Sequence, residues 1–152
     1  MLLEVSDLQT GYGKLPVVHG VSLSVDVNEV VAIVGPNGAG KTSIIKAIAG
    51  QLPLMAGSIQ FDGRDLSTVS AAGRQPLGMS VVPQSGNTFP DLTVEDNLRV
   101  SFSTLAREDA TVAIDAAFAM FPVLGERTNQ PAKTLSGGER QMLAFASGIG
   151  TN

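Results

Sequence analysis

A glycine-rich loop followed by a lysine and a threonine carries the residues of this chain best suited to bind phosphate. Gly35, four residues and then Gly40-Lys41-Thr42 have the spacing of a P-loop. In such a loop the glycines let backbone N–H groups face an anion, the lysine reaches the β- and γ-phosphates of a nucleotide, and the threonine hydroxyl binds Mg²⁺. The predicted phosphate-binding residues are Gly35, Pro36, Asn37, Gly38, Ala39, Gly40, Lys41, Thr42 and Ser43.

The residues on either side of this loop favour a phosphate site over an ordinary glycine-rich turn. Residues 30–34 are continuously apolar and mostly β-branched, which predicts a strand buried on both faces in a parallel sheet. A helix is expected to open at about Lys41, with its free N-terminal N–H groups and its dipole directed at the same point. Gly50 can end that helix as a C-cap, and Pro53 prevents its continuation.

A second pair of glycines opens another predicted helix, within residues 135–146. Ser136 and Glu139 have the spacing of a capping box, so one interpretation is an ordinary helix start. Gly137 and Gly138 are costly for a mere helix start, at roughly 1 kcal/mol each relative to alanine in a helix interior. They fit better in a bare helix N-terminus that an anion approaches.

Two single residues are further candidates for contact with a nucleotide or a metal ion. Tyr12 lies between two glycines, where an aromatic ring either packs locally in a turn or is exposed for stacking on a base. Gln84 follows residues 79–82, which we predict to be a strand, and is well placed there to reach a metal ion or water. Gln84 by itself is weak evidence for a contact with either a metal ion or water.

The segments around the loop predict an α/β fold with an antiparallel part and a helical part. Residues 17–27 alternate between apolar and polar, as in a half-buried antiparallel strand. Residues 57–63 form a further predicted strand that ends in an Asp-Gly turn signal. Thr93 with Asp96 resembles a helix-capping pair, and another helix is expected at residues 110–121.

Composition and charge limit the function classes. Of the 152 residues, 43% are hydrophobic, so we expect a globular protein and not a disordered tail. The longest apolar run is far shorter than the roughly 18 residues that span a bilayer, and no signal-like start is present, so the chain is expected to be soluble and cytosolic. The absence of cysteine excludes disulfides and thiolate metal sites. A net charge of −4 without a Lys/Arg cluster argues against nucleic acid as a partner.

Together, the P-loop, Tyr12, Gln84 and the Leu-Ser-Gly-Gly-Glu stretch resemble the nucleotide-binding subunit of an ABC transporter along essentially the whole chain. The resemblance implies that Tyr12 stacks on adenine and that residues 35–43 form the Walker A loop, which binds ATP. It implies Mg²⁺ beside Thr42 and Gln84, the latter also near the attacking water. It further implies a signature motif, which binds the γ-phosphate of ATP held by the opposite subunit, at Leu135, Ser136, Gly137, Gly138, Glu139 and Gln141.

Within this family, some stretches look most like the smaller ATP-binding subunit of branched-chain amino acid importers. These are residues 89–98, Phe121-Pro122 with Glu126-Arg127, and residues 134–142. The resemblance then implies two kinds of partner, a second ATP-binding subunit in a homo- or heterodimer and transmembrane permease subunits. It also implies that the chain itself is cytoplasmic and peripheral on the inner face of the cell membrane. One domain is expected, with a nucleotide-binding α/β core in residues 1–90 and a helical subdomain in residues 91–152.

The sequence also departs from the family pattern. In the family, the signature helix is followed by an apolar strand ending in Asp and the catalytic Glu, and then by a switch histidine, whereas this sequence stops at Asn152 before them. We therefore expect the N-terminal part of an ABC ATPase domain, unable to hydrolyse ATP alone and with the edge of strand 30–34 uncovered. Gln84 stands where these importers often carry Glu. Asn28 replaces a usual turn glycine, and Asn tolerates the left-handed conformation.

Three functions remain open at this point. The chain could belong to the energising ATPase of a membrane importer, to a soluble ABC-type ATPase acting on nucleic acid or ribosomes, or to a nucleotide-binding fragment without turnover. The lack of basic clusters counts against the second. The importer ATPase describes the family, and the nucleotide-binding fragment without turnover describes this polypeptide, so both can hold.

Overall fold

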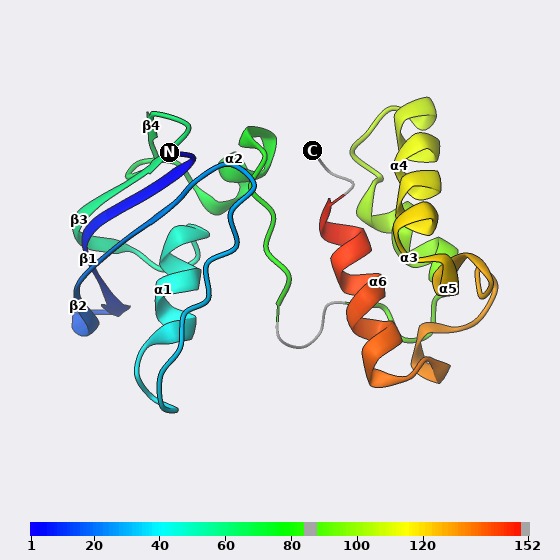
Figure 1. Cartoon of the computed structure of the whole chain (residues 1–152), viewed down its shortest axis with the longest axis horizontal. Helices are drawn as coiled ribbons and strands as arrows, with labels where there is room; N and C mark the ends of the chain where they lie inside the picture. The colour runs from blue at the N-terminus through cyan, green and yellow to red at the C-terminus, as the bar shows by residue number, and fades with distance from the viewer. Residues whose placement is uncertain (84–87, 150–152) are drawn as a thin grey trace. The chain divides into compact units, whose positions relative to one another are not determined.

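The computed structural model describes residues 1–83 and 88–149, so Gln84 lies outside the described residues. The chain forms two compact units, Met1–Leu77 and Gly78–Asn152 (Figure 1). The first contains the P-loop, the second contains the signature residues, and each has buried hydrophobic residues of its own. The division of one domain at residue 90 stays a prediction.

The first unit contains a four-stranded antiparallel sheet in the order β2-β1-β3-β4. The strands are β1 (Leu3–Tyr12), β2 (Leu15–Val25), β3 (Leu54–Phe61) and β4 (Arg64–Asp65). β1 lies in the middle, with Leu3 opposite both Val25 of β2 and Phe61 of β3. The strands predicted at residues 17–27 and 57–63 are thus confirmed, although they begin earlier in the chain.

Helix α1 (Lys41–Ile48) opens where the sequence predicts and contacts β1 and β2. Its buried side chains are Ser43, Ile44, Ala47 and Ile48. Gly50 follows the helix with a φ of 74°, the left-handed conformation that ends many helices. The unit ends with the short helices α2 (Ala71–Arg74) and η1 (Gln75–Leu77). Asn28 has a φ of 62°, which confirms that it adopts the left-handed conformation.

Two predicted strands do not form. Residues 30–34 have no regular secondary structure, and Val30 and Val34 are 95% and 87% exposed, so the prediction of a strand buried on both faces is wrong for this structure. A strand inside a parallel sheet depends on neighbours that satisfy its backbone N–H and C=O groups. Among the described residues, the sheet includes no such neighbour for residues 30–34. Residues 79–82 are likewise not part of a strand.

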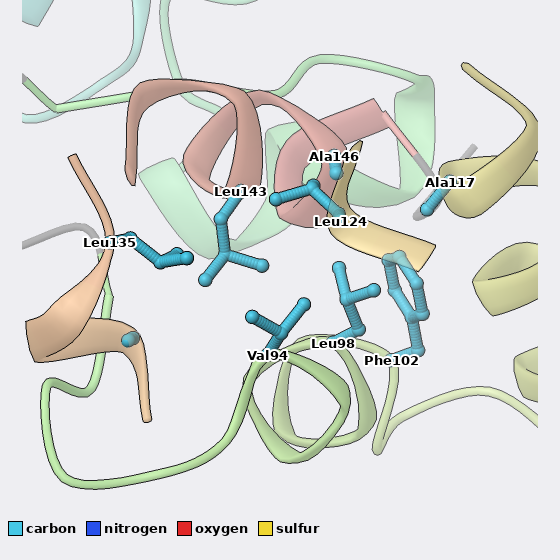
Figure 2. Packing of buried hydrophobic residues seen from close by; sticks show 9 residues of the cluster. Val94, Leu98, Phe102, Ala117, Leu124, Leu135, Leu143 and Ala146 are labelled. Atoms are coloured by element: carbon cyan, nitrogen blue, oxygen red, sulfur yellow. The ribbon is translucent and has the colours of Figure 1, made fainter. Parts of the chain in front are cut away.

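The second unit is helical around its own hydrophobic core. Its helices are α3 (Val94–Ser101), α4 (Arg107–Met120), α5 (Pro122–Gly125), η2 (Ala132–Thr134) and α6 (Gly137–Ile149). α4 confirms the helix predicted at 110–121. Figure 2 shows the core, which consists of Val94, Leu98, Phe102, Ala117, Leu124, Ala132, Leu135, Leu143 and Ala146. No helix in the described part of the chain is long and apolar enough to cross a membrane.

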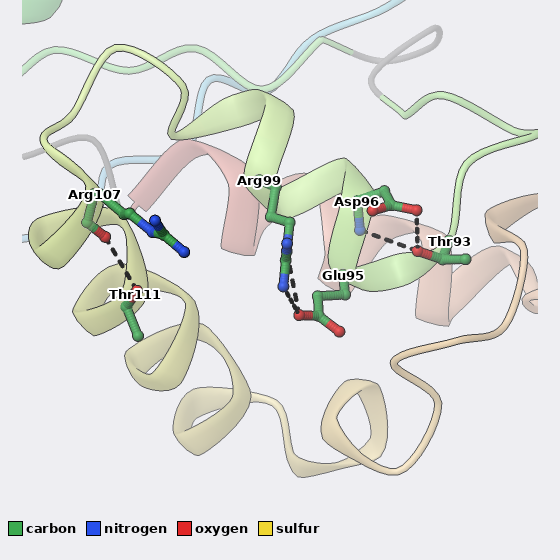
Figure 3. A network of polar contacts seen from close by, with 6 residues as sticks. All are labelled: Thr93, Glu95, Asp96, Arg99, Arg107 and Thr111. Carbon is green, nitrogen blue, oxygen red and sulfur yellow. Dashed lines mark hydrogen bonds and ion pairs between the residues drawn. The ribbon is translucent and has the colours of Figure 1, made fainter.

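The N-terminus of α3 has the predicted side-chain cap (Figure 3). The hydroxyl of Thr93 accepts a hydrogen bond from the backbone N–H of Asp96 at 3.1 Å and donates one to its carboxylate at 2.7 Å. One turn along, Glu95 and Arg99 form an ion pair at 2.6 Å. Local pairing of this kind fixes where α3 begins, because the cap satisfies a backbone donor that the helix itself cannot.

Candidate phosphate-binding site

The loop before α1 leads to a helix N-terminus without a side-chain cap. Gly40 is the N-cap residue, has a φ of 86°, and leaves the first turn without a side-chain acceptor. A Cβ at this position would lie 3.1 Å from Cγ2 of Val18, so both conformation and space favour glycine. The N–H groups of the first turn and the positive end of the helix dipole are therefore available to an anion.

The side chain of Lys41 lies along the same loop. Its ammonium group donates hydrogen bonds to the carbonyl oxygens of Gly35 and Pro36, each at 2.7 Å. A cation is thus held against the backbone that precedes the uncapped helix. This is the arrangement of charge and donors that a phosphate group needs.

The other residues predicted to bind nucleotide have different surroundings. Residues 35–39 and Thr42 are exposed, whereas Ser43 is buried. Tyr12 ends β1 and is 51% exposed, so its ring is not part of a core. Gln84 lies outside the described residues, and its predicted role near Mg²⁺ stays a prediction.

Arg74 supports the other end of α1, and sequence reasoning did not find it. Its side chain is buried, and its guanidinium donates to the carbonyl oxygens of Ala47 at 3.1 Å and Ile48 at 2.6 Å. Further bonds go to the carbonyls of Val69 at 3.0 Å and Leu66 at 2.8 Å. The cation thereby satisfies the last carbonyls of α1, where the helix dipole is negative. Burial lowers the pKa of Arg74 from its ordinary value.

In the second unit, Ser136 and Glu139 form the capping box that their spacing allows at the start of α6, so the expectation of a bare helix N-terminus is wrong. The Glu139 carboxylate accepts from the backbone N–H of Ser136 at 2.7 Å, and the Ser136 hydroxyl accepts from the N–H of Glu139 at 3.3 Å. The hydrogen bonds with the Ser136 backbone and side chain hold the pKa of Glu139 below its usual range, against a smaller effect of desolvation, and the charge of Arg127 adds to them.

The first turn of α6 is open around its two glycines. Gly137 and Gly138 are exposed, and a Cβ at either position would meet no atom within 4 Å. Leu135 is buried in the core of the second unit and Gln141 is exposed. Among the described residues, no group of three or more His, Cys, Asp or Glu side chains is placed to hold a metal ion.

A family model described as ABC transporter matches residues 18–152. The chain belongs to the ABC transporter family. The match includes both the P-loop and the signature residues, so the family that these motifs indicated is confirmed. Tyr12 lies outside the matched residues.

Two relatives of this ABC chain carry related names. A probable branched-chain amino acid transport ATP-binding protein of Archaeoglobus fulgidus is 37% identical over 148 residues, which cover 97% of this chain and 63% of that protein. A high-affinity branched-chain amino acid transport ATP-binding protein of Pseudomonas aeruginosa is 35% identical over 148 residues, which cover 97% of this chain and 64% of that protein. The ABC chain therefore spans somewhat less than two-thirds of the length of these relatives.

The fold of the ABC chain is similar to that of a solved nucleotide-free ATP-binding cassette from an ABC transporter. The TM-score is 0.87 at 24% sequence identity, and the likeness covers 99% of this chain and 65% of that one. At this identity the likeness concerns the fold. It confirms the predicted class, an α/β P-loop fold with an antiparallel β part and a helical subdomain.

Proposed function

We propose that this ABC chain binds ATP through residues 35–43, as part of the ATP-binding subunit of an importer for branched-chain amino acids. The observation that carries the proposal is that one loop combines the uncapped N-terminus of α1 with the ammonium group of Lys41. Helix N–H groups and a lysine cation both stabilise a phosphate anion. Bound Mg-ATP supplies the phosphoanhydride bond whose cleavage would energise transport.

The residues of the loop fit a nucleotide phosphate. Gly38 and Gly40 carry no side chain that would separate the backbone from an anion, and Thr42, an exposed residue, follows Lys41 in the first turn of α1. In this proposal Thr42 and Gln84 are the Mg²⁺ ligands. Tyr12, whose ring is exposed, stacks on the adenine base.

The same proposal gives the second unit a role in a dimer. Ser136 and Gly138 bind the γ-phosphate of ATP that a second ATP-binding subunit holds, and the open first turn of α6 supports this role. Transmembrane permease subunits complete the importer, and this chain lies against them on the inner face of the cell membrane. The names of the two relatives, which both mention branched-chain amino acid transport, support the transported substrate.

The proposal is tested by measuring Mg-ATP binding calorimetrically for wild type, Lys41→Ala and Lys46→Ala. Lys46 lies in the last turn of the same helix, so its substitution removes the same charge away from the loop. Charge-assisted hydrogen bonds contribute about 1.5–3 kcal/mol, so we expect Lys41→Ala to weaken binding by about 10- to 100-fold. Lys46→Ala should stay within about twofold of wild type. Equal affinity of Lys41→Ala and wild type would contradict the proposed site.

A further inference from the structure

The Glu139 carboxylate at the start of α6 has two separate partners. One oxygen, Oε2, accepts the hydrogen bond from the Ser136 backbone at 2.7 Å, and the other, Oε1, lies 3.4 Å from a terminal nitrogen of Arg127. The Glu139 side chain is only 17% exposed, while that of Arg127 is 39% exposed. Each oxygen of the cap is therefore held by a different group.

Arg127 is fixed by a turn that also supports α3. Its N–H donates to the carbonyl of Leu124 at 3.1 Å, and its own carbonyl accepts from Gln130 at 2.9 Å. The carbonyls of Gln130 and Thr128 accept the first two N–H groups of α3, from Val94 and Glu95, at 3.0 Å each. The turn thus connects the N-terminus of α3 with the N-terminus of α6.

The orientation of the Arg127 guanidinium leaves one of its buried donors without a hydrogen bond within the described part of the chain, which is destabilising. Its Nε is buried and has no hydrogen-bond partner among the described residues. A buried donor without a partner is destabilising. An arginine whose only task was to fill space would be expected to turn this N–H towards solvent, and the ion pair with Glu139 is the contact that opposes such a turn.

The negative charge of Glu139 at the start of α6 conflicts with the binding of a phosphate there. In the proposed function, a γ-phosphate approaches Ser136 and Gly138. Glu139 is ionised at neutral pH, and its negative charge lies in the same helical turn, where it would oppose the phosphate. The capping box that orders the turn therefore also introduces a charge of the wrong sign.

We propose that Arg127 is a positioning residue of the signature motif. Arg127 holds the Glu139 carboxylate on the Ser136 amide and offsets its negative charge, so that the first turn of α6 accepts a phosphate. This inference rests on the proposed function of the signature residues. Arg127 touches no nucleotide itself in this account. It acts through Glu139.

The test compares Mg-ATP-dependent self-association of wild type, Arg127→Ala, Arg127→Lys, Glu139→Gln and the double variant by sedimentation at low and high salt. Gln at this position still completes a capping box but carries no charge. We expect Arg127→Ala to weaken association by about two- to fivefold at low salt, the size of a partly exposed ion pair, and less at high salt. Arg127→Lys should recover most of the loss.

The decisive comparison is the effect of Arg127→Ala in the two backgrounds. In the Glu139→Gln background the substitution should change association by less than about 1.5-fold, because no charge remains to be offset. The same loss in both backgrounds, or no loss with Glu139 present, would overturn the inference. Arg107→Ala is the matched control, because Arg107 starts α4 in the same unit and forms no ion pair with Glu139.

A monomer measurement separates this inference from the proposed function. The Glu139 carboxyl titrated by NMR should have a higher pKa in Arg127→Ala than in wild type and an intermediate one in Arg127→Lys, and an unchanged pKa in Arg127→Ala would refute the ion pair. Mg-ATP binding to the monomer should be equal in all these variants, because the P-loop is untouched. Failure of Lys41→Ala to reduce that binding would instead contradict the proposed function.

Discussion

At the residue scale, Gly40 and Lys41 contribute different things to the phosphate site. Gly40 supplies a backbone conformation and leaves room beside Val18, so that α1 begins without a side-chain cap. Lys41 supplies the charge, which its bonds to two loop carbonyls keep beside the helix start. Backbone donors give directional contacts and the ammonium gives attraction, and phosphate binding uses both.

The requirement for glycine at position 40 can be measured against Gly38, which has the same φ of 86° but no atom within 4 Å of a Cβ. Gly38→Ala should lower the free energy of unfolding by about 1 kcal/mol, the cost of a left-handed alanine. Gly40→Ala should cost about 2 kcal/mol, because its Cβ also crowds Val18. Urea denaturation gives both values. Equal costs would show that the contact with Val18 is irrelevant.

Glu139 gives the chain a pH-dependent stability. Its folded pKa is depressed by the hydrogen bonds from Ser136 and by Arg127. Its stabilising contribution is therefore complete above the unfolded pKa of about 4.3 and is lost as pH falls through the lower folded value. Chemical denaturation between about pH 6 and 3 should show a smaller loss of stability for Glu139→Gln than for wild type. Parallel pH profiles would contradict the depressed pKa.

The sequence predicted those residue contacts whose partners are close in the chain. Ser136 and Glu139 are three residues apart, and the P-loop spacing places Lys41 beside its own loop. Arg74 could not be found in this way, because the carbonyls of Ala47 and Ile48 lie 27 and 26 residues before it. Nothing local distinguishes an arginine that will be buried from one that will be solvated.

At the element scale, α1 is defined at both ends by features that act on its dipole. Its N-terminus is left open for an anion, and its C-terminus is occupied by the guanidinium of Arg74. A cation at the C-terminus stabilises a helix through its dipole and donates hydrogen bonds to the last carbonyls. The position of the phosphate loop therefore depends on a residue far from it in the sequence.

Removing the Arg74 side chain should destabilise the first unit. Arg74→Ala leaves the carbonyl of Ile48 without this donor and takes one of two donors from the carbonyls of Ala47 and Leu66, so we expect the free energy of unfolding to fall by about 3 kcal/mol. Arg64→Ala, at an exposed arginine in β4, should change it by no more than about 0.5 kcal/mol. Thermal or urea denaturation of both variants tests this prediction. A free energy of unfolding for Arg74→Ala equal to that for Arg64→Ala would mean that the carbonyls find other donors.

Helices and antiparallel strands were predictable because their signals are local. Alternation along β2 and the cap at Thr93 depend on residues a few positions apart. The apolar, β-branched residues 30–34 have the composition of a buried strand, but a strand forms only where a neighbour pairs with it. The composition of residues 30–34 therefore indicates a preference for apolar, strand-like surroundings. Among the described residues no strand pairs with them, and Val30 and Val34 are exposed.

At the scale of the whole molecule, the phosphate loop and the signature residues belong to different compact units. Each unit has its own core, and the core of the second includes Leu135 directly before the capping box. In the proposed dimer, the first unit of one subunit and the second unit of its partner would meet one ATP molecule. The resemblance to the ABC family depends on motifs of both units, since one motif alone is ambiguous, and the family model that matches residues 18–152 spans both.

In the proposed function, ATP contacts the phosphate loop of a monomer, and the signature residues contact ATP only when a second subunit brings it. The most direct test is to add Mg-ATP to isotopically labelled protein at a concentration at which it is monomeric and to follow the backbone amide resonances by NMR. We predict large shifts for residues 37–43, which form the loop and the first turn of α1, and little change at Gly137 and Gly138. Large shifts at the two glycines with unchanged loop amides would contradict the account.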